Sequence, residues 1–79
     1  MNPQIKVALT VLRAELYTRG ATSLYNEIYA RIADGQIESV SRVLLALMMT
    51  MVGRKEKTSL MFAYGAVLRA LVLHGGQDA

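Results

Sequence analysis

The 79-residue chain has no cysteine and no tryptophan, a single proline and few aromatic side chains. Without cysteine it can form neither a disulfide framework nor a thiolate metal site. Hydrophobic residues make up 53% of the chain and charged residues 19%, which excludes a disordered tail, because disorder needs low hydrophobicity and high net charge. A chain of this length buries only about 60% of its unfolded surface, so a single copy is expected to be marginally stable.

The sequence also lacks a set of residues that could carry catalysis or bind a metal. His74 is the only histidine, and we expect it to interact with the dipole at the end of the last helix. The carboxylates are dispersed, so neither an acid–base pair nor an oxygen cage for a cation is evident. No glycine-rich phosphate loop is present. We therefore predict a protein that is not an enzyme and has no cofactor and no metal site.

Long hydrophobic runs are missing as well. The strongly apolar stretches 43–52 and 60–73 fall short of the roughly 20 residues that a membrane span requires. The first four residues lack the basic region and the apolar core of a signal peptide. We therefore expect a cytoplasmic protein and no membrane partner.

Glycines divide the chain into segments with helical spacing. Each glycine follows such a segment, where a left-handed residue commonly ends a helix. These glycines are Gly20, Gly35, Gly53 and Gly75. No window alternates with the period of a strand. The predicted helices span about 3–19, 23–34, 37–52 and 58–74. They form one all-α domain over 1–79, a compact bundle of four short helices joined by short connections, with 75–79 as a frayed C-terminal tail.

Three of the predicted helices, 3–19, 37–52 and 58–74, carry apolar residues on opposite sides. A helix that is apolar all round must be enclosed by its own chain or by another, and each Leu or Val left in water forfeits about 1.5–3 kcal/mol. We therefore predict a dimer or higher oligomer, or docking on a larger protein. The predicted contact surface comprises Val7, Val11, Ala14, Leu45, Met49, Val52, Ala63, Ala66 and Ala70.

Methionines and alanines in the second half of the chain refine this prediction. Met48 and Met51 share the core side of their helix, whereas Met49 lies on the other side with Leu45 and Val52. Methionine is flexible and frequent on surfaces that adapt to partners. The small side chains in 63–70 allow a close helix approach, either inside the chain or at a seam between chains.

The net charge is +3 with a pI near 9.6, and a basic domain binds nucleic acid only if its charges cluster. Most basic residues are scattered, and only Arg54, Lys55 and Lys57 lie together, interrupted by Glu56. We predict that these three form an exposed basic loop that steers an acidic partner.

One short string offers an alternative function. Residues 39–44, Ser-Val-Ser-Arg-Val-Leu, resemble the start of the recognition helix of lactose-repressor-like helix-turn-helix proteins. The resemblance implies a dimeric DNA-binding regulator that uses helices 23–34 and 37–52, with Ser39, Ser41 and Arg42 near DNA. The chain departs from the family in a first helix about two residues longer, and in a second helix that continues into an apolar run. Our first prediction therefore remains a small protein-binding module: a homo-oligomer, or an adaptor, inhibitor or regulator on a larger protein.

Overall fold

The computed structural model describes residues 1–53 and 58–75, apart from the side chain of Thr58, and these residues form four helices without a strand. The helices are α1 (Pro3–Thr18), α2 (Thr22–Ala33), α3 (Ile37–Met51) and α4 (Thr58–His74). All predicted boundaries agree to within one residue. The predicted basic loop of Arg54, Lys55 and Lys57 lies outside the described residues, as does the predicted tail beyond Gly75.

Local chemistry explains where the first two helices begin and end. The Asn2 Oδ1 atom accepts a hydrogen bond of 2.8 Å from the backbone N–H of Gln4, and Pro3 occupies the first helical position. At the other end of α1, Gly20 adopts a φ of +73°. This lets the N–H of Ala21 reach back to the Leu16 carbonyl at 2.8 Å, the Schellman pattern. Gly35, with a φ of +82°, ends α2 in the same way: the N–H of Gln36 donates to the Arg31 carbonyl at 2.9 Å.

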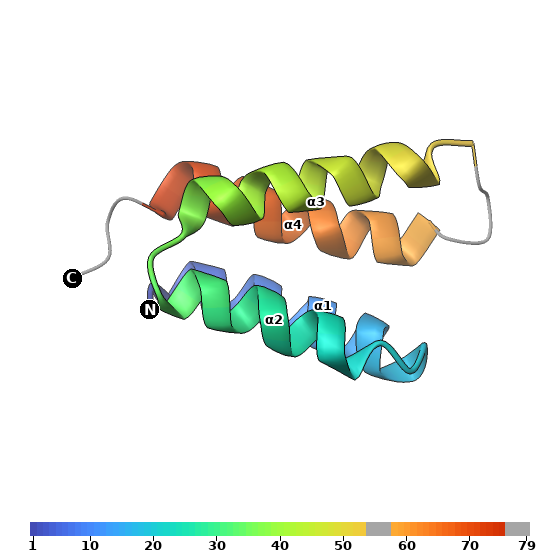
Figure 1. Cartoon of the computed structure of the whole chain (residues 1–79), viewed down its shortest axis with the longest axis horizontal. Helices are drawn as coiled ribbons and strands as arrows, with labels where there is room; N and C mark the ends of the chain where they lie inside the picture. The colour runs from blue at the N-terminus through green and yellow to red at the C-terminus, as the bar shows by residue number, and fades with distance from the viewer. Residues whose placement is uncertain (54–57, 76–79) are drawn as a thin grey trace.

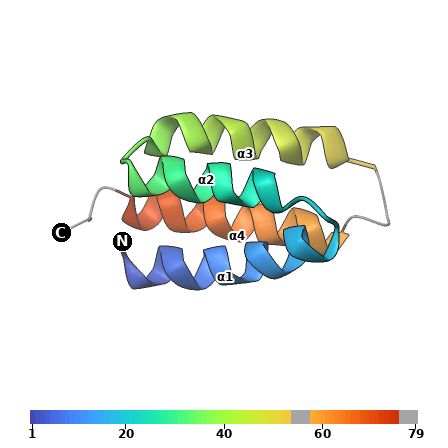
Figure 2. The ribbon, with the colours of Figure 1, turned by 60° about the horizontal axis from the view of Figure 1, so that its bottom comes forward.

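The four helices run alternately up and down along the long axis (Figures 1 and 2). Each helix contacts the next one in the chain, and α4 closes the ring by packing against α1. The contact between α1 and α4 is the most extensive in the bundle, although these helices are the farthest apart in sequence. The chain thus forms a ring in which α4 lies between α1 and α3.

The core lies along the centre of this ring and contains no buried charged or polar side chain among the described residues. Its most enclosed members repeat at helical spacing on α1, α3 and α4. They are Leu9, Leu12, Leu16, Val40, Leu44 and Val67. Met51 is also buried, as the sequence predicts, whereas Met48 is half-buried at the edge of the core.

Two alanines correct the predicted contact surface. Ala63 is 1% exposed and Ala70 is 8% exposed, so both belong to the core of this chain. Ala70 lies beside Ala8 of α1, and Ala63 lies two turns earlier on the same side of α4. Their small side chains allow α1 and α4 to approach closely. Ala63 is thus buried where the prediction placed it on the contact surface, whereas Ala70 also lines a groove between α1 and α4.

Two buried tyrosines give the fold a dependence on alkaline pH. Burial raises the pKa of Tyr64 above its usual value of 10.0, with Arg19 opposing the shift. Burial also raises the pKa of Tyr25, with Arg13 opposing it and two neighbouring tyrosines adding to it. Because the folded chain holds these phenols neutral, their contribution to stability is complete below the unfolded pKa of 10.0 and is lost as the pH rises through the folded value.

We expect the free energy of unfolding to fall above pH 10, and Tyr64→Phe to reduce that fall because phenylalanine cannot ionise. Urea unfolding at a series of pH values, followed by circular dichroism, measures the effect. Val72→Ala, at an exposed position of α4 that carries no ionisable group, is the control and should leave the pH dependence unchanged. Equal pH profiles for wild type and Tyr64→Phe would contradict the prediction.

Candidate protein-binding face

Exposed apolar side chains gather on the outer side of α4 and on the flanks of its two neighbours. On α4 itself, Phe62, Val72 and Leu73 are exposed, and Phe62, at 75%, is the most exposed of the large apolar residues. We define the apolar face by the residues of this surface that line two neighbouring grooves and carry its apolar or cationic character. These residues are Val7 and Val11 of α1, Met48 of α3, and Met61, Phe62, Gly65, Ala66, Arg69 and Leu73 of α4.

Two open grooves show that this surface is continuous across the three helices. One groove, of about 490 Å³, separates α4 from α3 and is lined by Met48, Met61 and Gly65. The other, of about 410 Å³, separates α4 from α1 and is lined by Val7, Val11 and Leu73 together with neighbouring residues. Both grooves share Ala66 and Arg69 of α4. The outer residues of α4 therefore form a ridge with a groove on either side.

Gly65 of α4 lines the first groove beside Met48 of α3. A Cβ atom built on Gly65 would lie 3.4 Å from the terminal methyl carbon of Met48, an ordinary van der Waals contact, and would meet no other atom within 4 Å outside the backbone of its own helix. Gly65 is inside α4, where glycine lowers helix stability by about 1 kcal/mol relative to alanine. A methyl group would therefore fit at this position, and nothing within the described part of the bundle requires glycine there.

Arg69 is the only Lys, Arg, Asp or Glu residue in α4, and its setting differs from that of the other described arginines. Arg19, Arg31 and Arg42 each form an ion pair of 2.6–2.8 Å with a glutamate four residues earlier, and Arg13 lies over the Tyr17 ring. Within residues 1–53 and 58–75, Arg69 makes no ion pair, side-chain hydrogen bond or ring contact of this kind. Arg69 thus brings to the apolar face a guanidinium whose N–H groups have no acceptor among the described residues.

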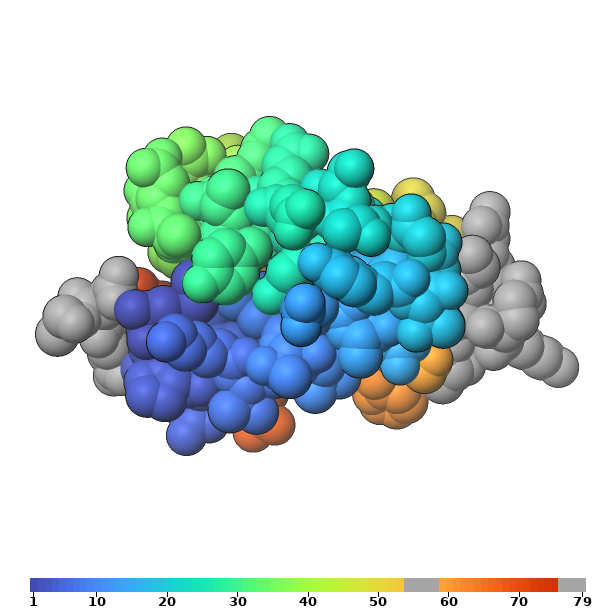
Figure 3. Space-filling view, turned by 90° about the horizontal axis from the view of Figure 1, so that it is seen from below, coloured from blue at the N-terminus to red at the C-terminus, as the bar shows by residue number. Residues whose placement is uncertain are grey.

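The surface on the other side of the bundle is polar. Figure 3 shows α1 and α2 covering one side of the molecule. Glu27 and Arg31 of α2 pair there, and Asp34 accepts a hydrogen bond from Gln36 at the end of the same helix. A face packed with paired charges is suited to water, and α2 contributes only Tyr29 to the large exposed apolar side chains of the described residues.

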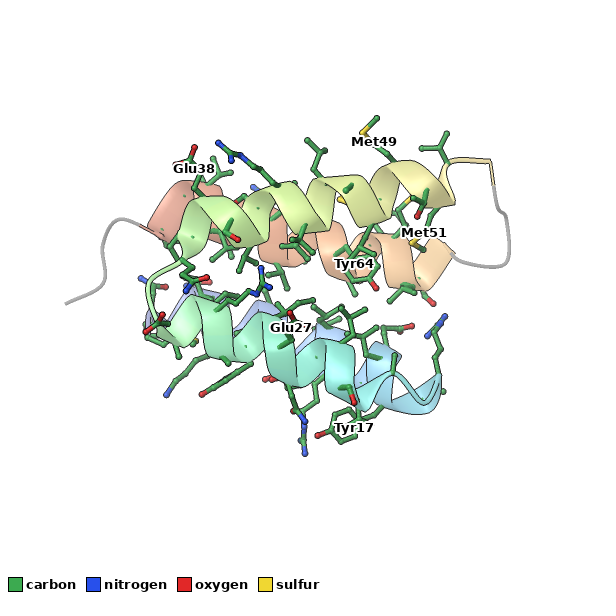
Figure 4. All side chains as sticks on the ribbon, viewed as in Figure 1. Tyr17, Glu27, Glu38, Met49, Met51 and Tyr64 are labelled. Atoms are coloured by element: carbon green, nitrogen blue, oxygen red, sulfur yellow. The ribbon has the colours of Figure 1, made fainter. Side chains whose placement is uncertain are left out.

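Most of the residues predicted for a contact surface are exposed. Val7, Val11, Ala14, Leu45, Met49, Val52 and Ala66 lie on the outside of the bundle. Figure 4 shows Met49 projecting away from α3, whereas Met51 and Tyr64 lie between the helices. Exposure alone leaves open whether anything binds there, so their role in a contact remains a prediction.

Sequence reasoning did not single out Phe62, because it selected only the alanines of this helix for the contact surface. A signal for the correct side was present. Arg69 follows Phe62 by seven residues, or two helical turns, so the two side chains lie on the same side of α4. A lone charged residue on an apolar helix marks the side that faces water, and Phe62 shares that side.

The residues of the DNA-binding alternative are placed differently from a helix-turn-helix. Arg42 is exposed but paired with Glu38 at 2.8 Å, Ser39 accepts a hydrogen bond of 3.3 Å from Arg31, and Ser41 is half-buried. In Figures 1 and 2, α2 and α3 lie side by side and antiparallel, whereas the helices of that motif cross at about 90–120°. This geometry does not favour the alternative.

No helix in the described part of the chain has both the length and the apolar character needed to cross a membrane. The same residues contain no cluster of three or more His, Cys, Asp or Glu side chains placed to hold a metal ion. Comparison with family models, with curated proteins and with solved structures finds no match to this chain.

Proposed function

We propose that this chain binds another protein through the apolar face, as a homo-oligomer or as an adaptor, inhibitor or regulator on a larger partner. The observation that carries the proposal is the exposure of Phe62, on a ridge between two grooves whose walls are largely apolar. Soluble monomers rarely expose contiguous apolar patches larger than a few hundred Å². Burying Val7, Phe62 or Leu73 against a partner contributes about 1.5–3 kcal/mol of favourable transfer free energy per side chain. This free energy favours association through the apolar face.

The shape of the apolar face indicates how the contact is made. Helices pack by placing the side-chain ridge of one in the groove of another, and the apolar face offers one ridge and two grooves. Phe62 is suited to be the anchor, because aromatic side chains in desolvated pockets supply most of the binding energy in protein interfaces. Arg69, beside it, adds a donor group that fits an aromatic ring or an acceptor of the partner.

Photocross-linking in the native host tests this proposal. A photoreactive phenylalanine analogue at position 62 should give covalent products with protein, because the side chain lies inside the contact. The same analogue at Tyr29, which is exposed on α2, is the matched control and should give few products. Equal yields at the two positions, or none at either, would contradict protein binding through the apolar face.

A further inference from the structure

We infer that the partner on the apolar face is a second copy of this chain, with the two α4 helices packed antiparallel about a two-fold axis between Gly65 and Ala66. This inference rests on the proposed function and specifies its partner. It assigns the same residues to both sides of the contact, as a two-fold interface requires.

The first support is the symmetry of α4 itself. Phe62 precedes Gly65 by three residues, and Arg69 follows Ala66 by three. In an antiparallel pair centred between Gly65 and Ala66, Phe62 of one copy therefore lies opposite the partner's Arg69, and the reverse contact forms on the other side of the axis. The exposed aromatic ring of each copy thus faces an arginine that has no partner among the described residues of its own chain, and this contact forms twice.

The second support is electrostatic. A guanidinium within about 6 Å of an aromatic ring is attracted to its face, and the attraction grows when water is excluded. A parallel pair would instead place the two Arg69 side chains next to each other, and unpaired like charges oppose association when they are desolvated. Among the packings of α4 on α4, the antiparallel one is the arrangement that gives each Arg69 a favourable neighbour.

The third support is the fit at the centre of the contact. Gly65 and Ala66 have the smallest side chains of the exposed side of α4, and small residues at a crossing point let two helices approach closely. The same two-fold axis places the α3–α4 grooves of both copies against each other, with Met48 of each copy near the axis. Methionine is flexible enough to fill the joined space.

The available area matches that of a stable dimer. The chain exposes 5080 Å². A standard interface buries about 800 Å² per partner, or about a sixth of that surface. One side of this molecule is therefore large enough, and the added burial supports a chain whose own core is small.

Sedimentation equilibrium at micromolar concentration tests the self-association, and a dimer is the expected result. Phe62→Glu should raise the dissociation constant at least about 30-fold, as for loss of an aromatic hot spot, while circular dichroism stays unchanged because Phe62 is exposed. Tyr29→Glu on α2 is the control and should leave the dimer intact. A wild-type chain that is monomeric at all concentrations would overturn the inference.

The absence of native cysteine allows introduced pairs to report the register. Ala66→Cys, next to the axis, should form a disulfide-linked dimer on mild oxidation. The double variant Phe62→Cys/Arg69→Cys should do the same, because position 62 of one copy faces position 69 of the other. Phe62→Cys alone should not, because the two cysteines at position 62 lie two helical turns apart, too far for a disulfide. Efficient cross-linking of Phe62→Cys alone would indicate a parallel pair and overturn the register.

The outcomes separate this inference from the proposed function. If photocross-linking at position 62 yields only products with a larger protein, and the purified chain is monomeric, the proposed function stands and the second copy is excluded. If position 62 cross-links to nothing, both fail. If the product has twice the mass of the chain and the cysteine pairs follow the antiparallel pattern, both are supported.

Discussion

Leu12→Ala is expected to lower the free energy of unfolding by about 3–4 kcal/mol. Leu12 is fully buried on the core side of α1, so its truncation removes apolar burial and leaves a cavity that the neighbouring helices fill only in part. A 79-residue domain has a total stability of roughly 4–12 kcal/mol. The variant should therefore lose at least about a quarter of its stability, as urea denaturation followed by circular dichroism will show.

Leu45→Ala is the matched control, because it makes the same chemical change at a half-exposed position on α3. Both substitutions are best measured in the Phe62→Glu chain, so that dimerisation does not add to the stability of either. There, Leu45→Ala should change the free energy of unfolding by about 0.5 kcal/mol or less. Similar losses at the two positions would mean that α1 or α3 is rotated relative to the core described above.

Ala63→Leu is expected to destabilise the chain by about 1–3 kcal/mol, because it forces extra methylene groups into a buried position of α4. Ala63 faces the α1 side of α4 and is almost completely enclosed. Thermal unfolding in the Phe62→Glu chain measures the loss as a lower melting temperature.

Ala66→Leu provides the comparison within the same helix. Ala66 lies on the exposed ridge, one turn from Ala63, so a larger side chain there meets water and should leave the melting temperature nearly unchanged. In the wild-type chain the same substitution should weaken dimerisation, because it enlarges the centre of the proposed contact. Equal melting temperatures for the two leucine variants would contradict the placement of Ala63 in the core.

The positions of the helices could be predicted because their signals are local. Gly20 and Gly35 adopt the left-handed conformation just after α1 and α2, and such residues end helices through contacts with the preceding turn. The core side of α1 could also be identified, since Ile5, Leu9 and Leu12 repeat at the spacing of one helical face. These features depend on a few neighbouring residues, all of which the sequence shows.

The outward side of α4 could not be predicted in the same way. Both of its sides are apolar, so periodicity does not tell which one meets water. The answer depends on the ring order of the bundle: α4 lies between α1 and α3, which encloses Ala63 and Ala70 and leaves Phe62 outside. Only Arg69 carried local information on this point, and one charged residue was insufficient to overcome the expectation drawn from the alanines.

The packing of α1 against α4 has a consequence for folding during translation. α4 follows its principal packing partner, α1, only after α2 and α3 along the chain. A nascent chain that has completed α3 still exposes the side of α1 that α4 will cover. Domains fold as units during translation, so this unit is complete only once α4 has been made. Until then the growing polypeptide presents apolar surface to chaperones.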